Sequence, residues 1–71
     1  MKKEIVMNSV QASRTEAGLT QEELAEQAGV SRQTVIAIEK GSYAPSVLLA
    51  LKLGAIFKTP VEKLFRVTYE K

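Results

Sequence analysis

Cysteine and histidine are both absent from this chain of 71 residues. Without cysteine the chain can form neither a disulfide framework nor a thiolate metal site, so we expect no metal. Extra stability for so small a domain has to come from close helix packing or from a second subunit. The side chains most often used in catalysis are missing, as is a glycine-rich phosphate loop, and the chain is too short to enclose a pocket. We therefore expect no enzyme, no cofactor and no small-molecule substrate.

Long apolar runs are absent too. The longest, Val47 to Leu51, is far shorter than the about 20 residues that span a bilayer, and the few apolar residues after Lys3 do not make a signal peptide. We expect a soluble, cytoplasmic protein with no membrane partner. The 45% apolar and 25% charged residues are typical of one folded domain, residues 1–71. A formal charge of +2 fits a nucleic-acid partner but is too small to argue for one.

Glycine and proline are few, and they fall at the boundaries between segments of helical composition. Gly18 is expected to end the first helix in a left-handed conformation. Thr20 and Glu23 have the spacing of a capping box, which predicts a helix start. The five expected helices are roughly Asn8 to Ala17, a second beginning at Thr20, Ser31 to Lys40, Ser46 to Phe57, and Pro60 to Phe65. The fourth is apolar nearly all round, which predicts burial on more than one side.

The most informative spacing lies within Gln21 to Lys40. Two helices that cross through a short turn need a small residue at their contact, a residue tolerant of positive φ in the turn, and an apolar anchor on the second helix. Ala25, Gly29 and Val35 supply these in order. We expect these three residues to have structural roles.

At this point the sequence resembles the Cro/repressor-like (XRE-type) helix-turn-helix family, in particular its short single-domain regulators. The segments that match its pattern are Gly18 to Glu26, Gly29 to Thr34, Ile38 to Gly41, and Pro45-Ser46. The resemblance implies an all-α fold, a compact five-helix lambda-repressor-like domain. Its expected parts are a core at 8–65, a helix-turn-helix at 20–40 and a dimerisation segment at 61–71.

The resemblance also implies a sequence-specific transcription regulator, with repression as the favoured role, that binds double-stranded DNA through Ser31 to Lys40 in the major groove. The expected base-contacting residues are Arg32, Gln33, Thr34 and Ala37. An arginine can pair with guanine and a glutamine with adenine, while threonine and alanine can touch a thymine methyl. The expected phosphate-contacting residues are Gln21, Ser31, Lys40, Ser42 and Tyr43. For Ser31, a role as a helix cap is an equally weighted alternative. For Tyr43, packing over the loop is an equally weighted alternative.

Two other positions are expected to have a structural role, and four depart from the family's usual residues. In this family an arginine and a glutamate at the positions of Arg14 and Glu39 commonly form a partly buried salt bridge, so that pair is expected to tie the first helix to the third. The departures are Ser13 where leucine is common, Ile36 and Leu48 where polar residues are usual, and Lys58 where a helix-ending glycine is common.

Charge and the C-terminal residues together predict a homodimer. The segment Gln21 to Gly41 contains four glutamates against only Arg32 and Lys40, so one copy would bind DNA weakly. Two copies would read a palindrome with half-sites about 34 Å apart. The expected interface residues are Val61, Leu64, Phe65, Val67 and Tyr69. The segment from Phe65 to Tyr69 alternates like a strand, and Lys3 to Met7 can pair with it or with its symmetry mate; a frayed terminus is the alternative.

A second function stays open at this stage. The same fold serves in antitoxin-like modules that mainly bind another protein. Loss of function on changing Phe65 or Tyr69, with Arg32 and Gln33 dispensable, would favour that alternative.

Overall fold

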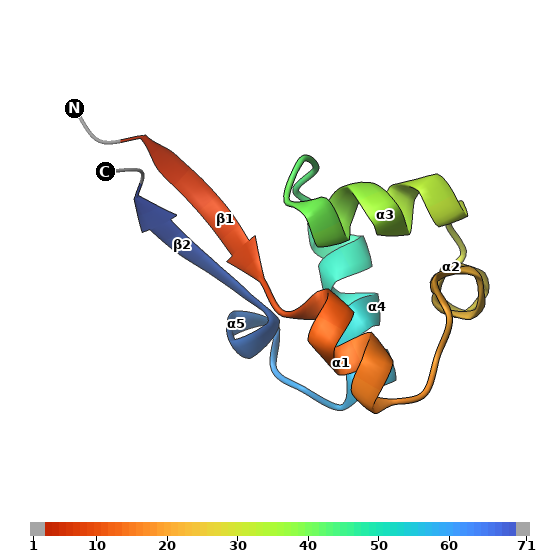
Figure 1. Ribbon diagram of the computed structural model, residues 1–71. Helices are drawn as coiled ribbons and strands as arrows, with labels where there is room; N and C mark the ends of the chain where they lie inside the picture. The colour runs from red at the N-terminus through yellow and green to blue at the C-terminus, as the bar shows by residue number, and fades with distance from the viewer. Residues whose placement is uncertain (1–2, 70–71) are drawn as a thin grey trace.

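Residues 3–69, the part of the chain that the computed structural model describes, form five helices packed into a body and two strands that project from it as an arm (Figure 1). In chain order the elements are β1 (Glu4–Asn8), α1 (Val10–Glu16), α2 (Gln21–Ala28), α3 (Arg32–Lys40), α4 (Val47–Phe57), α5 (Val61–Leu64) and β2 (Phe65–Tyr69). The arm accounts for the elongated outline of 39 × 23 × 21 Å. No helix among these residues is long and apolar enough to cross a membrane.

The starts of α2, α3 and α4 are fixed by side-chain caps. The hydroxyl of Thr20 accepts the N–H of Glu23 at 3.0 Å while the Glu23 carboxylate accepts the N–H of Thr20 at 2.8 Å, so the predicted capping box is present. Ser31 and Ser46 cap α3 and α4 through their hydroxyls. Each of these caps satisfies a backbone N–H that has no partner inside its own helix.

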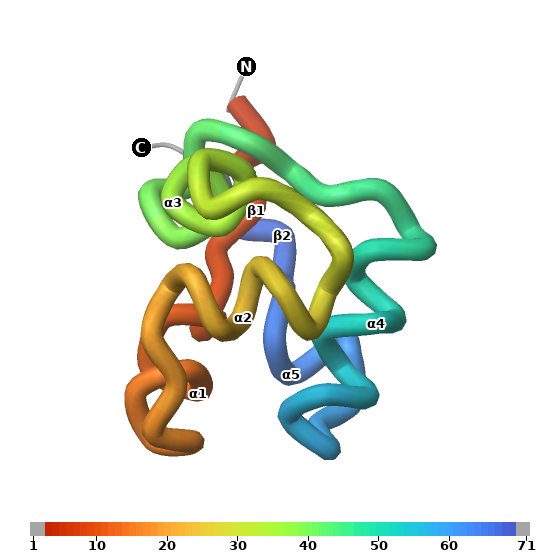
Figure 2. The backbone as a smooth tube through the Cα atoms, turned by 90° about the vertical axis from the view of Figure 1, so that its right-hand side faces the viewer, coloured from red at the N-terminus to blue at the C-terminus, as the bar shows by residue number. Residues whose placement is uncertain are grey.

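The core lies between the helices and is wholly apolar. Figure 2 shows α2 between α1 and α3, with α4 running down the other side of the body. The buried residues shared by these elements are Val10, Leu24, Ala25, Ala28, Val35, Ile38, Leu49, Leu53 and Leu64. Ala25 is 3% exposed and Val35 is 1% exposed, as expected for the small contact residue and the anchor of the second helix. Gly29 ends α2 at φ 72°, a left-handed conformation that glycine adopts without strain.

The expectation that α4 is buried on more than one side is wrong. Its buried residues are Leu49, Ala50, Leu53 and Gly54, which lie on one side of the helix; Leu49 and Leu53 belong to the core cluster. On the opposite side Val47, Leu48 and Leu51 are 76%, 65% and 57% exposed. A single small core covers only one face of the helix, because no further element of the described chain packs on the other.

The all-α expectation is also wrong, because the two ends of the described chain pair as antiparallel strands. Glu4 lies opposite Tyr69, Val6 opposite Val67, and Asn8 opposite Phe65. The strand expected at Phe65 to Tyr69 is therefore present, and it pairs with the N-terminal segment of the same chain. It begins where α5 ends, so Phe65 belongs to β2 and not to the fifth helix.

Candidate nucleic-acid interface

Helix α3 has one side in the core and one side open to solvent. Val35 and Ile38 are each 1% exposed, and they fix the helix to the body. Arg32, Gln33 and Lys40 are exposed, whereas Thr34, Ile36 and Ala37 are half-buried. The first turn therefore presents a guanidinium and a carboxamide to solvent from a helix whose position is set by the core.

The hydroxyl groups at the start of α3 are held within the helix. Ser31 Oγ accepts the N–H of Thr34 at 3.2 Å, and the two side-chain oxygens lie 3.0 Å apart in a further hydrogen bond. Ser31 is thus a helix cap in the unbound protein, one of the two roles considered for it. The γ-methyl group of Thr34 takes no part in these bonds, so it remains available for an apolar contact.

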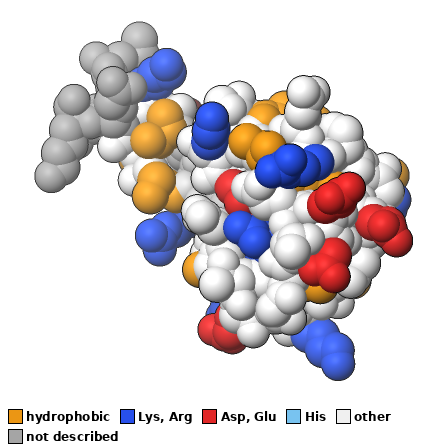
Figure 3. Space-filling model, turned by 45° about the vertical axis from the view of Figure 1, so that its right-hand side comes forward, with side chains coloured by type: hydrophobic (Ala, Val, Ile, Leu, Met, Phe, Trp, Pro, Cys, Tyr) orange, Lys and Arg blue, Asp and Glu red, His pale blue; other side chains and the backbone are white. Residues whose placement is uncertain are grey.

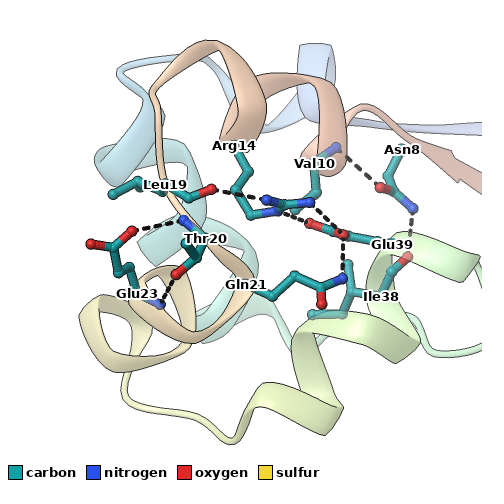
Figure 4. Close-up of polar contacts among 9 residues, drawn as sticks. All are labelled: Asn8, Val10, Arg14, Leu19, Thr20, Gln21, Glu23, Ile38 and Glu39. Atoms are coloured by element: carbon teal, nitrogen blue, oxygen red, sulfur yellow. Dashed lines mark hydrogen bonds and ion pairs between the residues drawn. The ribbon is translucent and has the colours of Figure 1, made fainter.

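A buried ion pair links the first helix to the third (Figure 4). Arg14 Nε donates to Glu39 Oε2 at 2.7 Å and Arg14 Nη2 donates to Glu39 Oε1 at 3.3 Å. Only 13% of the Arg14 side chain and 4% of the Glu39 side chain are exposed. Arg14 Nη1 also donates to the carbonyl of Leu19 at 2.9 Å. Arg14 and Glu39 do form the structural pair expected from the sequence, and it holds the loop before α2 as well.

Gln21, at the first position of α2, belongs to the same network. Its Nε2 donates to Glu39 Oε1 at 3.1 Å, and Figure 4 shows Gln21 and Arg14 converging on the Glu39 carboxylate. Gln21 and Arg32 also line one open hollow, together with Arg14, Thr20 and Glu22. The start of α2 and the start of α3 therefore border the same depression, whose wall carries basic and amide groups together with the carboxylate of Glu22.

Asn8 contributes a contact that sequence reasoning missed. Its Oδ1 accepts the N–H of Val10 at 3.1 Å, and its Nδ2 donates to the carbonyl of Ile38 at 2.8 Å. The first bond satisfies the N–H of the first residue of α1, which begins at Val10 and not at Asn8; the N-cap position itself, Ser9, makes no side-chain cap hydrogen bond. The preference of asparagine for helix starts was a usable signal for this local contact. The bond to the Ile38 carbonyl joins residues 30 positions apart in the chain, so no local sequence pattern could have predicted it.

The other end of α3 carries the second group of expected phosphate contacts. Gly41 ends the helix at φ 80°, and Ser42 Oγ donates to the carbonyl of Ala37 at 3.2 Å. Lys40 is exposed and Tyr43 is 46% exposed. Tyr43 lines a hollow of about 250 Å³ between the α3–α4 loop and the arm, beside Phe65. The expected phosphate-contacting groups thus flank both ends of α3.

Acidic side chains gather on one side of the body, as Figure 3 shows. Glu22, Glu23 and Glu26 of α2 are all exposed. The backbone N–H and the hydroxyl of Thr20 hydrogen-bond the Glu23 carboxylate and hold its pKa below the ordinary value. Glu23 therefore stays charged near the start of α2, where it repels a phosphate as well as capping the helix.

The residues expected at a dimer interface divide by exposure. Val67 and Tyr69 are 57% and 56% exposed, and Val61 and Phe65 are half-buried. The assignment of Leu64 to that surface is wrong, because Leu64 is 1% exposed and packs in the core of its own chain. Residues 70 and 71 of the expected dimerisation segment lie outside the described part of the chain.

Comparison with known proteins identifies the family that shares this sequence and geometry. The profile described as "Helix-turn-helix" matches residues 10–64. An uncharacterised HTH-type transcriptional regulator of Methanothermobacter thermautotrophicus is 51% identical over 57 residues, which is 79% of this chain and 83% of the relative. The regulator YgzD of Bacillus subtilis, named in the same terms, is 52% identical over 58 residues, 82% of this chain and 88% of the relative.

Two solved structures share the fold. The restriction-modification controller protein C.AhdI from Aeromonas hydrophila superimposes with a TM-score of 0.70 and 31% identity, covering 76% of this chain and 82% of its own. A Bacteroides fragilis protein whose suggested role is DNA binding superimposes with a TM-score of 0.78 and 22% identity, covering 87% of this chain and all of its own (100%). The second likeness concerns the fold alone.

Proposed function

The chain belongs to the helix-turn-helix family of DNA-binding transcriptional regulators, and from this premise we propose that it represses transcription by binding a palindromic operator as a homodimer. The observation that carries the proposal is α3, whose Val35 and Ile38 are buried while Arg32 and Gln33 are exposed on its first turn. A side chain has to project from a rigid helix to reach base edges in the major groove.

The base-reading residues are Arg32, Gln33, Thr34 and Ala37. Arg32 donates two hydrogen bonds to guanine O6 and N7, and Gln33 pairs with the N6 and N7 of adenine. The methyl groups of Thr34 and Ala37 contact thymine. Each half-site accordingly contains guanine and adenine next to each other, read from the first turn of α3.

Phosphate contacts position α3 in the groove but carry no sequence information. Gln21 and the N-terminus of α2 meet the backbone on one side, through the hollow that Gln21 shares with Arg32. Lys40, Ser42 and Tyr43 meet it on the other side. The glutamates of α2 weaken this binding for a single copy. Two copies related by a two-fold axis double the contacts, which is why the proposal includes a dimer.

Binding-site selection from a random duplex pool tests the function. It is run at low and near-physiological salt, with the wild type and with Arg32→Ala plus Gln33→Ala. A control with Lys58→Ala plus Gln27→Ala removes the same charge and the same carboxamide from exposed positions outside α3. We expect the wild type and the control to enrich one palindrome that the α3 variant does not enrich. Enrichment of nothing at either salt contradicts the proposal.

A second candidate function is an antitoxin-like module that binds another protein. The exposed apolar face of α4, with Val47 at 76% and Leu48 at 65% exposure, favours it. Its signature is a biological activity that is lost when Phe65 or Tyr69 is changed and survives loss of Arg32 and Gln33. The operator-binding proposal predicts the reverse sensitivity for the α3 pair.

A further inference from the structure

Ile36 is an apolar residue in the second turn of α3 that the core does not use. Val35 and Ile38 belong to the buried cluster that fixes α3. Within residues 3–69, Ile36 is neither in that cluster nor among the apolar side chains packed against it, although it is half-buried. A polar residue is usual in the family at this position, and the contacts proposed for α3 give the departure no role.

The helical period places Ile36 on the solvent side of α3. Residues three and four positions apart on a helix are neighbours on its surface. Arg32 and Gln33, four and three positions before Ile36, are exposed, and so is Lys40, four positions after it. In Figure 1 the other helices lie on one side of α3, so its opposite side is open. Ile36 therefore lies among these three polar side chains.

The remaining surface neighbour of Ile36 is Glu39, three positions after it. The Glu39 carboxylate accepts hydrogen bonds from Arg14 and Gln21. An apolar side chain beside this network can shield it from water, which is a structural role for Ile36. Such shielding stabilises the fold, but it gives DNA binding no dependence on a methyl group of any base.

We propose that Ile36 is a specificity-determining residue that contacts the C5 methyl group of a pyrimidine in the major groove. This inference rests on the operator binding of the proposed function and adds one base to those that α3 reads. Thymine presents its methyl group to the major groove. Isoleucine neither donates nor accepts hydrogen bonds through its side chain, so the methyl group is the feature of a base edge that it recognises, by burying apolar surface.

The position of Ile36 along α3 indicates where this pyrimidine lies. Each helical residue advances about 1.5 Å along the axis, so Ile36 lies about 6 Å beyond Arg32. Successive bases of one strand are about 3.4 Å apart. For a helix that lies along the groove, the methyl group is therefore one or two base pairs from the guanine of Arg32. Thymine and 5-methylcytosine both carry this group, so either base can be its source.

Replacing thymine with uracil in the selected operator tests the contact, because it removes the C5 methyl group and keeps the hydrogen-bonding groups of the base. Each thymine of a half-site is replaced singly, and fluorescence anisotropy measures the binding of the wild type and of Ile36→Ala. We expect one position at which uracil weakens wild-type binding about 3- to 5-fold, as the loss of one buried methyl group predicts. At that position uracil should leave the binding of Ile36→Ala unchanged.

Cytosine and 5-methylcytosine at the same position distinguish the two sources of the methyl group. We expect the wild type to bind the methylated operator about 3- to 5-fold more tightly than the unmethylated one, and Ile36→Ala to bind both equally. A wild type that is weakened by uracil but gains nothing from 5-methylcytosine supports the contact and limits its source to thymine.

Two matched variants serve as controls. Thr34→Ser removes the γ-methyl group of Thr34 and keeps a hydroxyl to bond Ser31. Leu48→Ala removes an apolar side chain that is 65% exposed on α4, outside the reading helix. Both should keep the uracil effect at the position assigned to Ile36. Each protein is compared with itself on two DNAs, so a loss of stability or of overall affinity in Ile36→Ala cancels in the ratio.

The outcomes separate this contact from the function on which it rests. A selected operator without a uracil-sensitive thymine overturns the proposal for Ile36 alone, as do equal uracil effects in the wild type and Ile36→Ala. Failure to select any operator overturns the proposed function and the Ile36 contact with it.

Discussion

At Glu39 one carboxylate accepts hydrogen bonds from Arg14 and from Gln21, on two other helices. The side chain is 4% exposed, so the charge depends on these partners. Removing one member of a buried pair leaves the other charge without compensation, whereas replacing both with apolar residues often costs little. The pair therefore specifies how α1, α2 and α3 meet, which sets the direction of the α3 side chains that we propose to contact bases.

Arg14→Met should lower the free energy of unfolding by about 3–5 kcal/mol, because it leaves the buried Glu39 carboxylate with the Gln21 hydrogen bond but without a counter-charge. The double variant Arg14→Met with Glu39→Leu should be more stable than the single one. Urea denaturation followed by circular dichroism measures both, with Lys63→Met as an exposed control. A double variant that is less stable than Arg14→Met would contradict this reading.

Lys58 ends α4 at φ 53°, the one non-glycine residue with positive φ among residues 3–69. A left-handed conformation costs an L-residue about 1–2 kcal/mol, and replacing it by glycine removes this strain. Part of that stabilisation is lost because glycine has more conformational entropy in the unfolded chain. Lys58→Gly should therefore raise the free energy of unfolding by about 0.5–1 kcal/mol. Thermal unfolding checks this, with Lys63→Gly inside α5 as a destabilising control. A loss of stability in Lys58→Gly would show that Lys58 makes compensating contacts.

Among the elements, α2 is the helix whose start depends most clearly on charge. The hydrogen bonds from Thr20 lower the pKa of Glu23 in the folded state. A carboxyl group with a lowered folded pKa adds stability that is present above the unfolded pKa, about 4.3, and is lost as the pH falls through the folded pKa. The capping box should therefore weaken only in acid.

Glu23→Ala should destabilise the protein at pH 7, and the difference from the wild type should shrink as the pH falls below about 4.3. Urea denaturation across that range measures the difference. Glu22→Ala removes a carboxylate from the same turn but no bond to Thr20, and it serves as the control. A difference that is constant down to strongly acidic pH would contradict the role of the charged carboxylate.

The turn between α4 and α5 depends on a close backbone approach at Gly54. A Cβ atom there would lie 2.9 Å from the carbonyl oxygen of Thr59 and 3.3 Å from Val61 Cγ2. Helix propensity favours alanine over glycine by about 1 kcal/mol. The overlap with backbone should outweigh it, so we expect Gly54→Ala to lower the free energy of unfolding by about 1–3 kcal/mol. Chemical denaturation decides the sign, and a more stable variant would mean that the turn can shift at no cost.

The elements also show what the sequence could predict. The caps at Thr20 and Ser31 and the turn at Gly29 were predictable, because each depends on residues a few positions apart. The pairing of Val6 with Val67 was left open, since strand partners distant in the chain leave no periodic signal in either strand. The exposed face of α4 was misjudged because Val47 and Leu48 are apolar, and composition does not show how many elements cover a helix.

For the whole molecule, the net charge of +2 is the sum of basic and acidic side chains that are unevenly distributed over the surface. Acidic α2 lies next to α3, so the proposed DNA binding relies on a few basic groups and, in that proposal, on two copies of the chain. Gln21 and Lys40 could be singled out from the sequence because they lie at the two ends of a recognisable helix-turn-helix. Which edge of the arm faces away from the helices (Figure 1) could not be read from the sequence, because it depends on how β1 and β2 sit on the folded body.

The central claim is that Arg32 reads a guanine, and the most direct measurement pairs a protein change with a base change. Wild type and Arg32→Ala are titrated against the selected operator and against the same operator with 7-deazaguanine, which lacks the N7 acceptor, at the guanine assigned to Arg32. We expect the modified base to weaken wild-type binding by about 5-fold or more, within the 1–3 kcal/mol of a bidentate pair, and to leave Arg32→Ala binding unchanged. Equal weakening of both proteins would contradict the claim.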